Sequence, residues 1–447
     1  MSASRSYRVE PADTVGGEIQ VPGDKSVSHR ILMLGGIAEG VCEACGFLAS
    51  EDCLSTLGAL RAMGVAVERP TETDVRVHGA GISGLAQASA PLDLGNAGTA
   101  MRLMMGLLAG QAFDSTLVGD SSLMRRPMER VAKPLRSMGA SIQTVEGHPP
   151  VRIQGGAQLA PIDYTLPVAS AQVKSALLLA ALYARGTSWI TEPVVTRDHT
   201  ELMFRSFGVQ LTRSGTRIGL AGGQRPRGCR LQVPADFSSA AFFLVAGCLA
   251  AHQPEGLILR QVGCNPTRTG LLEMLRLMGA RIEVRRHEGG GAEPIADLIV
   301  HAGPLRGIRV PEALVALAID EFPAFFIAAA AAEGETLVTG AAELRVKESD
   351  RLAVMAEGLS TLGVSCELLP DGIRIQGRGA GSDPRCFGGG RIDSHGDHRI
   401  AMAFAMASLR ARDTVVIDDV ANVATSFPGF VPLARDAGLK LQEVSQA

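Results

Sequence analysis

The chain is poor in aromatic residues, lysine and long apolar runs, and each shortage argues against a class of protein. Phe, Trp and Tyr make up 4% of the 447 residues, too few for the stacked aromatic platforms that bind single-stranded nucleic acid. The formal net charge of −3 also argues against binding nucleic acid through bulk charge. No apolar run is long enough to span a bilayer, so we expect no membrane partner.

The cysteine pattern predicts neither a metal centre nor a disulfide framework. The eight cysteines are scattered, and Cys42 and Cys45 form a lone CxxC pair without the second pair or nearby His that a zinc set needs. The N-terminal sequence MSASRSYRVEP has no apolar core, so no signal peptide is expected. We therefore expect a cytoplasmic protein that keeps its thiols reduced.

Lysine is rare among the cations. Five of the 43 basic residues are lysines. Where Arg is the usual cation, a lysine either marks a position that needs a compact charge or a titratable amine, or occurs there by chance. Lys25 and Lys347 lie in the densest polar motifs and are the strongest candidates. The five are Lys25, Lys133, Lys174, Lys347 and Lys440.

What the chain has in abundance is repetition. Six segments rich in Gly, Ala, Asp and Ser each precede a strongly apolar stretch, and a second phrase ending in Gly follows each one. The period is roughly 70 to 85 residues, longer than that of common solenoids, so each repeat is a small folding unit. The openings start at Gly23, Gly95, Ala169, Ala235, Asp320 and Gly396. The second phrases end at Gly64, Gly139, Gly208, Gly279, Gly363 and Gly438.

The six repeats divide into two groups of three. VPGDKSVSHR from Val21 and VPADFSSAAF from Val233 resemble each other and mark the openings of two equivalent halves. We predict one domain over 23–234 and a second over 1–22 plus 235–447. A hinge is expected near 21–23 and 233–236.

Apolarity is concentrated in the helices, which decides the fold class. The first helix of each repeat is apolar on nearly all sides and must be buried. The second is amphipathic and ends at a Gly that suits a C-cap, before a strand-like run. Three repeats then enclose their apolar helices within an outer layer of sheets. The alternative, a doubly wound sheet, requires apolar strands and amphipathic helices instead.

The polar residues lie at the helix starts, where free N–H groups attract anions. Lys25 and Arg30 lie near the start of the first apolar helix, although cations are unfavourable in a first helical turn. An anion site is therefore favoured over a solvated helix start capped by Ser26. Asp320 opens the fifth apolar helix and, as an acid there, equally suits the helix dipole.

Three further motifs are weak when taken singly. GNAGTAMR from Gly95 is explained by a tight turn with Asn96 as the cap. Arg125 and Arg126 are suited to gripping a carboxylate or a phosphate, or form a surface pair. Lys347 and Arg351 are spaced i, i+4, which predicts one shared helix face.

Taken in order, these segments resemble the 5-enolpyruvylshikimate-3-phosphate synthase family of enolpyruvyl transferases. The resemblance runs from about Val21 to Phe430 and rests on GDKSVSHR, GNAGTAMR, RRPM, ASAQVKSA, TRDHTE, DEFP, LRVKESDR and GDHRIAM. It implies two inside-out α/β barrel-like domains, each of three βαβαββ repeats, that close on substrate. It also implies transfer of an enolpyruvyl group from phosphoenolpyruvate to shikimate 3-phosphate, without a cofactor or metal, by an enzyme expected to be a monomer.

The resemblance assigns roles residue by residue. Lys25, Lys347, Asp320 and Glu348 match the groups at the reaction centre, and we favour Glu348 as the acid at the methylene carbon. The residues that match shikimate 3-phosphate contacts are Lys25, Ser26, Arg30, Ser170, Ala171, Gln172, Arg197, Asp320 and Lys347. The residues that match phosphoenolpyruvate contacts are Lys25, Asn96, Gly98, Arg126, Gln172, Arg351 and Arg399, with Arg102 in the same loop as Asn96.

The chain departs from the family pattern at one position. Many members carry a Lys just before Thr-Phe-Pro in the last segment, where this chain has Ser426 in TSFPGF. The branch of the family that carries Ser-Phe-Pro at this position is often associated with tolerance of the inhibitor glyphosate. Tolerant members can carry Ala where this chain has Gly98. Because Gly98 leaves room for glyphosate, we expect glyphosate to inhibit this protein.

Two alternatives remain. The sister transferase that acts on UDP-N-acetylglucosamine shares the fold, but it often carries a reactive Cys in the loop that here reads GDSSLMRRPM. A sixfold ring that clamps DNA needs Lys and Arg along the length of its helices. In this chain the apolar helices carry charge only at their starts.

Overall fold

The computed structural model describes residues 5–250, 252, 254–288, 291–379 and 384–445, which form two compact units. The continuous unit comprises residues 23–234 and the short segment that ends at Glu293. The composite unit comprises the described residues of 1–22, 235–288 and 294–447. The ends of the predicted second domain, 1–4 and 446–447, lie outside the described residues.

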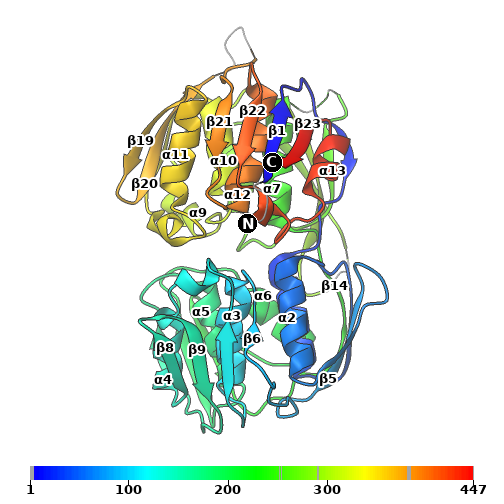
Figure 1. The fold of residues 1–447 in the computed structure, drawn as a ribbon, viewed down its shortest axis with the longest axis vertical. Coiled ribbons are helices and arrows are strands. Elements are labelled where there is room, and N and C mark those ends of the chain that lie inside the picture. Colours follow the sequence, from blue (N-terminus) through cyan, green and yellow to red (C-terminus); the bar gives the residue numbers. More distant parts are fainter. Residues whose placement is uncertain (1–4, 251, 253, 289–290, 380–383, 446–447) are drawn as a thin grey trace. The chain divides into compact units, whose positions relative to one another are not determined.

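The continuous unit repeats one βαβαββ pattern (Figure 1). Two of the three copies are uninterrupted in sequence. The copy that begins at α1 takes its first strand, β14, from the end of the unit. The first copy is α1 (Lys25–Gly36), β3 (Glu39–Cys45), α2 (Glu51–Ala62), β4 (Ala66–Glu68) and β5 (Val75–Ala80), with β14 (Arg230–Gln232). The second is β6 (Leu92–Asp93), α3 (Gly98–Leu108), β7 (Ser115–Val118), α4 (Glu129–Ser137), β8 (Ser141–Val145) and β9 (His148–Gln154). The last is β10 (Asp163–Thr165), α5 (Ala171–Ala181), β11 (Thr187–Thr191), α6 (His199–Ser206), β12 (Thr212–Ser214) and β13 (Arg217–Ala221).

The composite unit repeats the same pattern and uses the start of the chain to complete it. One copy is β2 (Gly17–Ile19), α7 (Phe237–Ala250), β15 (Leu257–Gly263), α8 (Gly270–Leu277), β16 (Arg281–Arg286) and β17 (Ile295–His301). The next is α9 (Glu312–Val315), α10 (Phe322–Ala331), β18 (Glu333–Val338), α11 (Arg351–Thr361), β19 (Ser365–Leu369) and β20 (Gly372–Arg378). The last is β21 (Gly390–Asp393), α12 (His398–Ala407), β22 (Val415–Asp418), α13 (Phe430–Asp436), β23 (Lys440–Ser445) and β1 (Arg5–Glu10).

One sheet plan explains why an apolar helix follows each first strand. In β6-β7-β9-β8, β6 runs parallel to β7, while β9 is antiparallel to both β7 and β8. Leu117 of β7 pairs with Leu92 on one side and Val151 on the other. Parallel neighbours need a long crossover, which α3 supplies. In the β18 sheet, isolated bridges from Arg306 and Arg309 occupy the place of a first strand.

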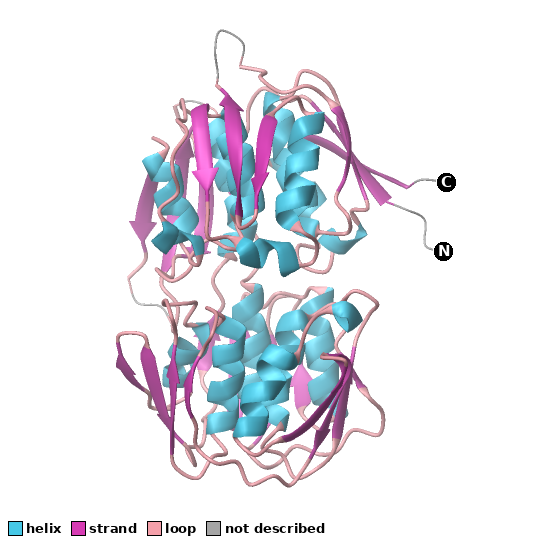
Figure 2. Ribbon diagram, turned by 90° about the vertical axis from the view of Figure 1, so that its left-hand side faces the viewer, coloured by secondary structure: helices cyan, strands magenta, loops and turns pink. Residues whose placement is uncertain are grey.

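Burial separates the two helices of each repeat. Every residue of α7, α10 and α12 is buried, as are most residues of α1, α3 and α5. The second helices, such as α4, bury one face. In each unit the strands lie outside the helices (Figure 2), and each unit has its own hydrophobic core. The predicted inside-out α/β fold is confirmed.

The glycines that end the second phrases all adopt the left-handed conformation that a C-cap needs. Their φ angles run from +77° to +113°, where a side chain is strained and Gly is not. The prediction that they end the amphipathic helices is therefore confirmed. They are Gly64, Gly139, Gly208, Gly279, Gly363 and Gly438.

Two Gly→Ala changes separate conformation from packing. An added Cβ meets nothing within 4 Å at either Gly208, which has a φ of +77°, or Gly58 in the interior of α2. We expect Gly208→Ala to lower the free energy of unfolding by about 1 kcal/mol, and Gly58→Ala to raise it by up to about 1 kcal/mol. Urea unfolding measures both, and equal shifts of the same sign would contradict the assignment of Gly208 as a cap.

Candidate active site

The first polar cluster lies at the start of α1. Asp24 caps the helix, because its carboxylate accepts a hydrogen bond from the Val27 backbone N–H at 2.8 Å. The alternative of a helix start capped by Ser26 is therefore wrong: Asp24 precedes the first helical residue, which places its side chain beside the free N–H groups. Lys25 Nζ lies 3.0 Å from Asp52 Oδ2 on α2, with 18% of the lysine side chain exposed.

Arg30 is buried one turn further along α1 and is fixed from every side of its guanidinium. Its Nε donates to Thr200 Oγ1 at 2.7 Å, one terminal nitrogen to the Ser26 carbonyl at 2.8 Å, and the other to Ser175 Oγ at 3.0 Å. The pKa of Arg30 is lowered to about 10, mainly by burial. The charge of Arg197 also lowers this pKa, whereas Glu201 and other carboxylates raise it. Arg30 therefore stays charged at neutral pH.

The loop before α3 joins Asn96 to Arg126. Asn96 donates to Asp120 Oδ2 at 2.7 Å and accepts from Arg126 at 2.6 Å. The expected Asn96 cap is wrong, because Ala97 occupies the N-cap position of α3 and Asn96 binds side chains instead. A Cβ added at Gly98 would lie 2.9 Å from a terminal nitrogen of Arg126, so the backbone of Gly98 and the guanidinium are close neighbours.

The start of α5 supplies a hydroxyl and an amide. Ser170 is the N-cap residue and accepts from the Val173 backbone N–H at 3.4 Å, and Ala171 is the first helical residue. Gln172 accepts from Arg102 at 2.7 Å and donates to Thr99 Oγ1 at 3.0 Å. The structure thus connects the starts of α3 and α5 through the Arg102–Gln172 pair.

Arg197 lies immediately before α6, as the sequence predicts. Asp198 is the N-cap residue of α6, and Arg197 is half-buried in the segment that joins β11 to this helix. Arg197 lies three residues before Thr200, whose hydroxyl accepts a hydrogen bond from Arg30 Nε at 2.7 Å, so the same segment of chain carries Arg197 and contacts Arg30. Two neighbouring arginines suit a doubly charged anion.

In the composite unit, three cations converge on Asp320. Lys347 Nζ lies 3.6 Å and a terminal nitrogen of Arg351 lies 3.5 Å from Asp320 Oδ1. Arg399 donates to the Asp320 backbone carbonyl at 3.0 Å. Asp320 directly precedes Glu321, the N-cap residue of α10. The fifth and sixth repeats therefore present one cluster.

Arg351 is the most deeply buried member of this cluster. It donates to Glu348 at 2.5 Å and to Asp397 at 2.8 Å, and 1% of its side chain is exposed. Burial lowers the pKa of Arg351, but Asp397, Glu348 and Asp320 outweigh burial and hold it above its ordinary value. The guanidinium is therefore a permanent charge.

The prediction of a shared helix face for Lys347 and Arg351 is wrong. A short 3-10 helix ends at Val346 and α11 begins at Arg351, so Lys347 is not helical. Asp350 caps α11 by accepting a hydrogen bond from the Ala353 N–H at 3.1 Å, so a new helix begins between Lys347 and Arg351. The side chains of Lys347 and Arg351 meet at Asp320 instead.

Comparison with known proteins identifies the family. The family model for EPSP synthase, 3-phosphoshikimate 1-carboxyvinyltransferase, matches residues 9–433. The 3-phosphoshikimate 1-carboxyvinyltransferase of Alkalilimnicola ehrlichii is 58% identical over 97% of this chain and 96% of its own length. That of Methylococcus capsulatus is 58% identical over 98% of each.

The chain belongs to the EPSP synthase family.

Solved structures agree with this assignment. The EPSP synthase of Acinetobacter baumannii is 52% identical, with a TM-score of 0.88 over 99% of this chain and 100% of that one. The enolpyruvyl transferase NikO of Streptomyces tendae has a TM-score of 0.78 at 16% identity, so it shares the fold alone. The named EPSP synthases favour the predicted enzyme class over the sister transferase, and this chain is an enzyme of that class.

Several carboxylates of the site were not predicted as site residues. Asp52 pairs with Lys25, Asp120 with Asn96, and Asp397 with Arg351. A signal for Asp397 was present, because Asp24, Asp236 and Asp397 all precede apolar helices and bind the first backbone N–H groups. Nothing in the local sequence marks Asp52 or Asp120.

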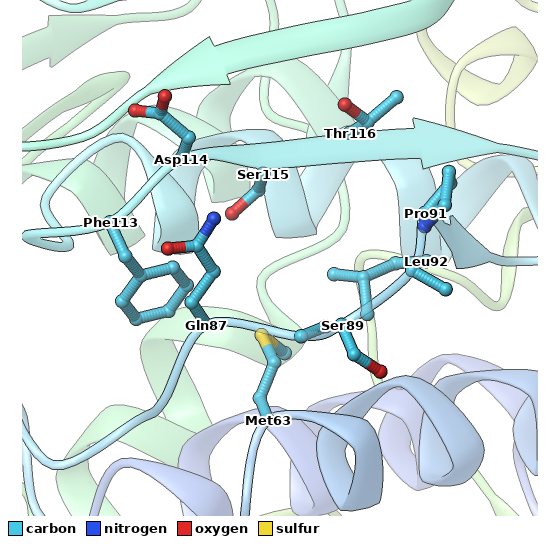
Figure 3. Close-up of a pocket in the computed structure, with 11 residues that line it drawn as sticks. Met63, Gln87, Ser89, Pro91, Leu92, Phe113, Asp114, Ser115 and Thr116 are labelled. Atoms are coloured by element: carbon cyan, nitrogen blue, oxygen red, sulfur yellow. The ribbon is translucent and has the colours of Figure 1, made fainter.

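A pocket of the continuous unit contains none of the predicted site residues. Its volume is about 220 Å³, and it lies where the segment 87–92 passes the start of β7 (Figure 3). Gln87, Phe113, Asp114 and Ser115 line it together with Met63 at the end of α2. We assign it no role in the family reaction.

Two features are absent among the described residues. No group of three or more His, Cys, Asp or Glu among them is arranged to hold a metal ion. In the same part of the chain, no helix combines the length and apolarity that crossing a membrane requires.

Buried His29 predicts a pH dependence of stability. Its Nδ1 lies 2.8 Å from Thr56 Oγ1, and burial lowers the pKa of His29 from 6.5 to about 3. Above pH 6.5 the ring is neutral in both states. Below it the unfolded chain binds a proton that the fold excludes, so stability falls by roughly 1.4 kcal/mol per pH unit down to about pH 3.

The variant His29→Leu tests this assignment. It should lose less unfolding free energy than the parent between pH 7.5 and 4.5, measured by urea unfolding at each pH. Identical pH profiles for the two proteins would show that His29 is not the group responsible.

Proposed function

We propose that this chain transfers the enolpyruvyl group of phosphoenolpyruvate to the 5-hydroxyl of shikimate 3-phosphate and releases phosphate. The observation that carries the proposal is identity of 58% over nearly the whole length to proteins named 3-phosphoshikimate 1-carboxyvinyltransferase. The charge of the candidate site supports it, because both substrates carry a phosphate and a carboxylate and the helix starts gather cations.

We propose that the cations hold the two substrates as the family resemblance implies. Guanidiniums fixed by protein hydrogen bonds, as in Arg30 and Arg351, bind phosphate or carboxylate without reorganising. Shikimate 3-phosphate is assigned to Lys25, Ser26, Arg30, Ser170, Ala171, Gln172, Arg197, Asp320 and Lys347. Phosphoenolpyruvate is assigned to Lys25, Asn96, Gly98, Arg126, Gln172, Arg351 and Arg399.

The first step proposed is addition. The 5-oxygen of shikimate 3-phosphate bonds to C2 of phosphoenolpyruvate while the methylene carbon gains a proton and becomes a methyl group. Asp320 accepts the hydroxyl proton, and Glu348 donates the proton to carbon. Glu348 is 25% exposed and within 2.5 Å of Arg351, so it lies in the same cluster as Asp320.

The second step proposed is elimination from the tetrahedral intermediate. The methyl group returns a proton to Glu348, the C2–O bond to phosphate breaks, and the C=C bond forms again. The hydroxyl proton that Asp320 accepted leaves with the phosphate, so both carboxyl groups return to their starting states. Lys25 and Lys347 stabilise the charge of the departing phosphate and of the carboxylates. Proton transfers and loss of phosphate balance both steps, so we propose no cofactor.

We also propose that the enzyme works as a monomer in the cytoplasm. All eight cysteines are free thiols, which suits a reducing compartment. Light scattering of the purified protein would measure the mass of the species in solution. A stable dimer would contradict the proposal that the enzyme is a monomer.

Product analysis tests the proposed reaction. Incubation with both substrates should yield free phosphate and a product whose proton NMR spectrum shows two vinyl protons of an enol ether at the 5-oxygen. Hydrolysis of phosphoenolpyruvate to pyruvate without such a product would contradict enolpyruvyl transfer.

Removing either lysine should slow turnover. Lys25→Ala and Lys347→Ala each remove a half-buried charge, and we expect kcat to fall by at least about tenfold. Lys133→Ala, at an exposed position on α4, serves as the matched control and should keep the parent rate. Parent-like kcat for either lysine variant would refute its assigned role.

Gly98→Ala should reduce inhibition by glyphosate. The added Cβ would lie 2.9 Å from Arg126 and 3.2 Å from Arg102, so both guanidiniums must shift and the space next to them narrows. The inhibition constant measured against phosphoenolpyruvate should rise, with the Michaelis constant for phosphoenolpyruvate rising less. Superimposable inhibition curves for the two proteins would contradict this.

A further inference from the structure

Lys174 on α5 is a buried cation to which neither the fold nor the proposed chemistry assigns a task. Its side chain is 0% exposed, whereas the other four lysines are half-buried or exposed. Taking an ammonium out of water is strongly unfavourable unless partners compensate, so the surroundings of Lys174 must supply opposite charge and hydrogen-bond acceptors.

The partners of Lys174 lie on either side of Arg197 in the sequence. Lys174 Nζ lies 3.1 Å from Glu192 Oε2, which follows β11, and 2.8 Å from Glu201 Oε1 on α6. It also donates to the Thr196 carbonyl at 3.4 Å. The lysine therefore ties both ends of the segment 192–201 to α5.

Glu192 completes the hold on Thr196. One carboxylate oxygen of Glu192 accepts hydrogen bonds from both the backbone N–H of Thr196, at 3.2 Å, and its hydroxyl. Lys174 and Glu192 together bind the N–H, the carbonyl and the side chain of Thr196. Arg197 follows Thr196 in the chain, so these hydrogen bonds fix the position at which the backbone of Arg197 begins.

The same cluster continues to Arg30. Thr200 on α6 accepts from Arg30 at 2.7 Å and donates to Ser175 at 2.7 Å, and Ser175 neighbours Lys174 on α5. After burial, the charge of Glu201 is the largest influence on the pKa of Arg30. Helices α1, α5 and α6 thus share one buried polar network, which reaches the neighbours of both arginines.

We propose that Lys174 is a positioning residue, which with Glu192 and Glu201 sets the place of Arg197 relative to Arg30 for the phosphate of shikimate 3-phosphate. This inference rests on the proposed function. Stability alone does not call for the cluster, because well-packed apolar residues of similar volume often replace buried ion pairs without loss of stability.

The decisive variant removes all three charges and keeps the volume: Lys174→Met, Glu192→Gln and Glu201→Gln combined. The Michaelis constant for shikimate 3-phosphate should rise by about tenfold or more, because a misplaced guanidinium loses its phosphate contact. Values of kcat and of the Michaelis constant for phosphoenolpyruvate should change by less than about threefold. Leu178→Met, fully buried on the same helix, is the matched control.

A double-mutant cycle shows whether Lys174 and its partners act through Arg197. Glu192→Gln alone preserves the shape and should raise the Michaelis constant for shikimate 3-phosphate, but should have no further effect once Arg197→Ala is present. Additive effects, unchanged constants in the triple variant, or equal losses for both substrates would overturn the proposal. Failure of both Glu192→Gln and the triple variant to fold would make the cluster a stability element and also overturn it.

The parent enzyme separates this test from that of the proposed function. A parent that releases no phosphate with shikimate 3-phosphate refutes the function, and the inference falls with it. An active parent with unaltered variants refutes the inference alone.

Discussion

The burial of one apolar helix in each repeat is the constraint on which the rest of the structure depends. Helices such as α7 and α10 have no polar face, so sheets must surround them, and the hydrogen-bonding groups at their first turns become the places where polar side chains gather. Asp24, Asp236 and Asp397 satisfy those groups in three repeats. The fold itself therefore requires polar side chains at the helix starts, independently of any substrate.

The helix starts carry out different tasks. Those of α1, α3 and α5 hold Lys25, Asn96 and Gln172, while those of α10 and α12 contribute to the cluster around Asp320. At the start of α7, Asp236 binds Arg268 at 3.2 Å, which pairs the charges within the protein. The sequence shows no cation there, which fits a structural role. The repeats thus share a fold but not a function.

Much of the fold was predictable because its signals are local. Apolar helices and terminal glycines are visible over a dozen residues, and the φ angles of Gly64 and its five equivalents confirmed the helix ends. The segment 347–350 was not predictable by spacing alone, because Asp350 starts a new helix where the i, i+4 pattern suggested continuity.

The partners of the site residues were harder to predict than the residues themselves. Asp52 reaches Lys25 from another helix, and Glu192 and Glu201 reach Lys174 from different elements, so only the packing of helices brings them together. Motif spacing reports a residue type and its element. It does not report which carboxylate neutralises a buried charge, because that depends on tertiary contacts.

The acceptor specificity of phosphate release tests the central claim most directly. Phosphate release from phosphoenolpyruvate should be rapid with shikimate 3-phosphate and undetectable with UDP-N-acetylglucosamine, since the assigned arginines and lysines suit a small doubly anionic acceptor. Release that depends on the nucleotide sugar, with none from shikimate 3-phosphate, would contradict the account.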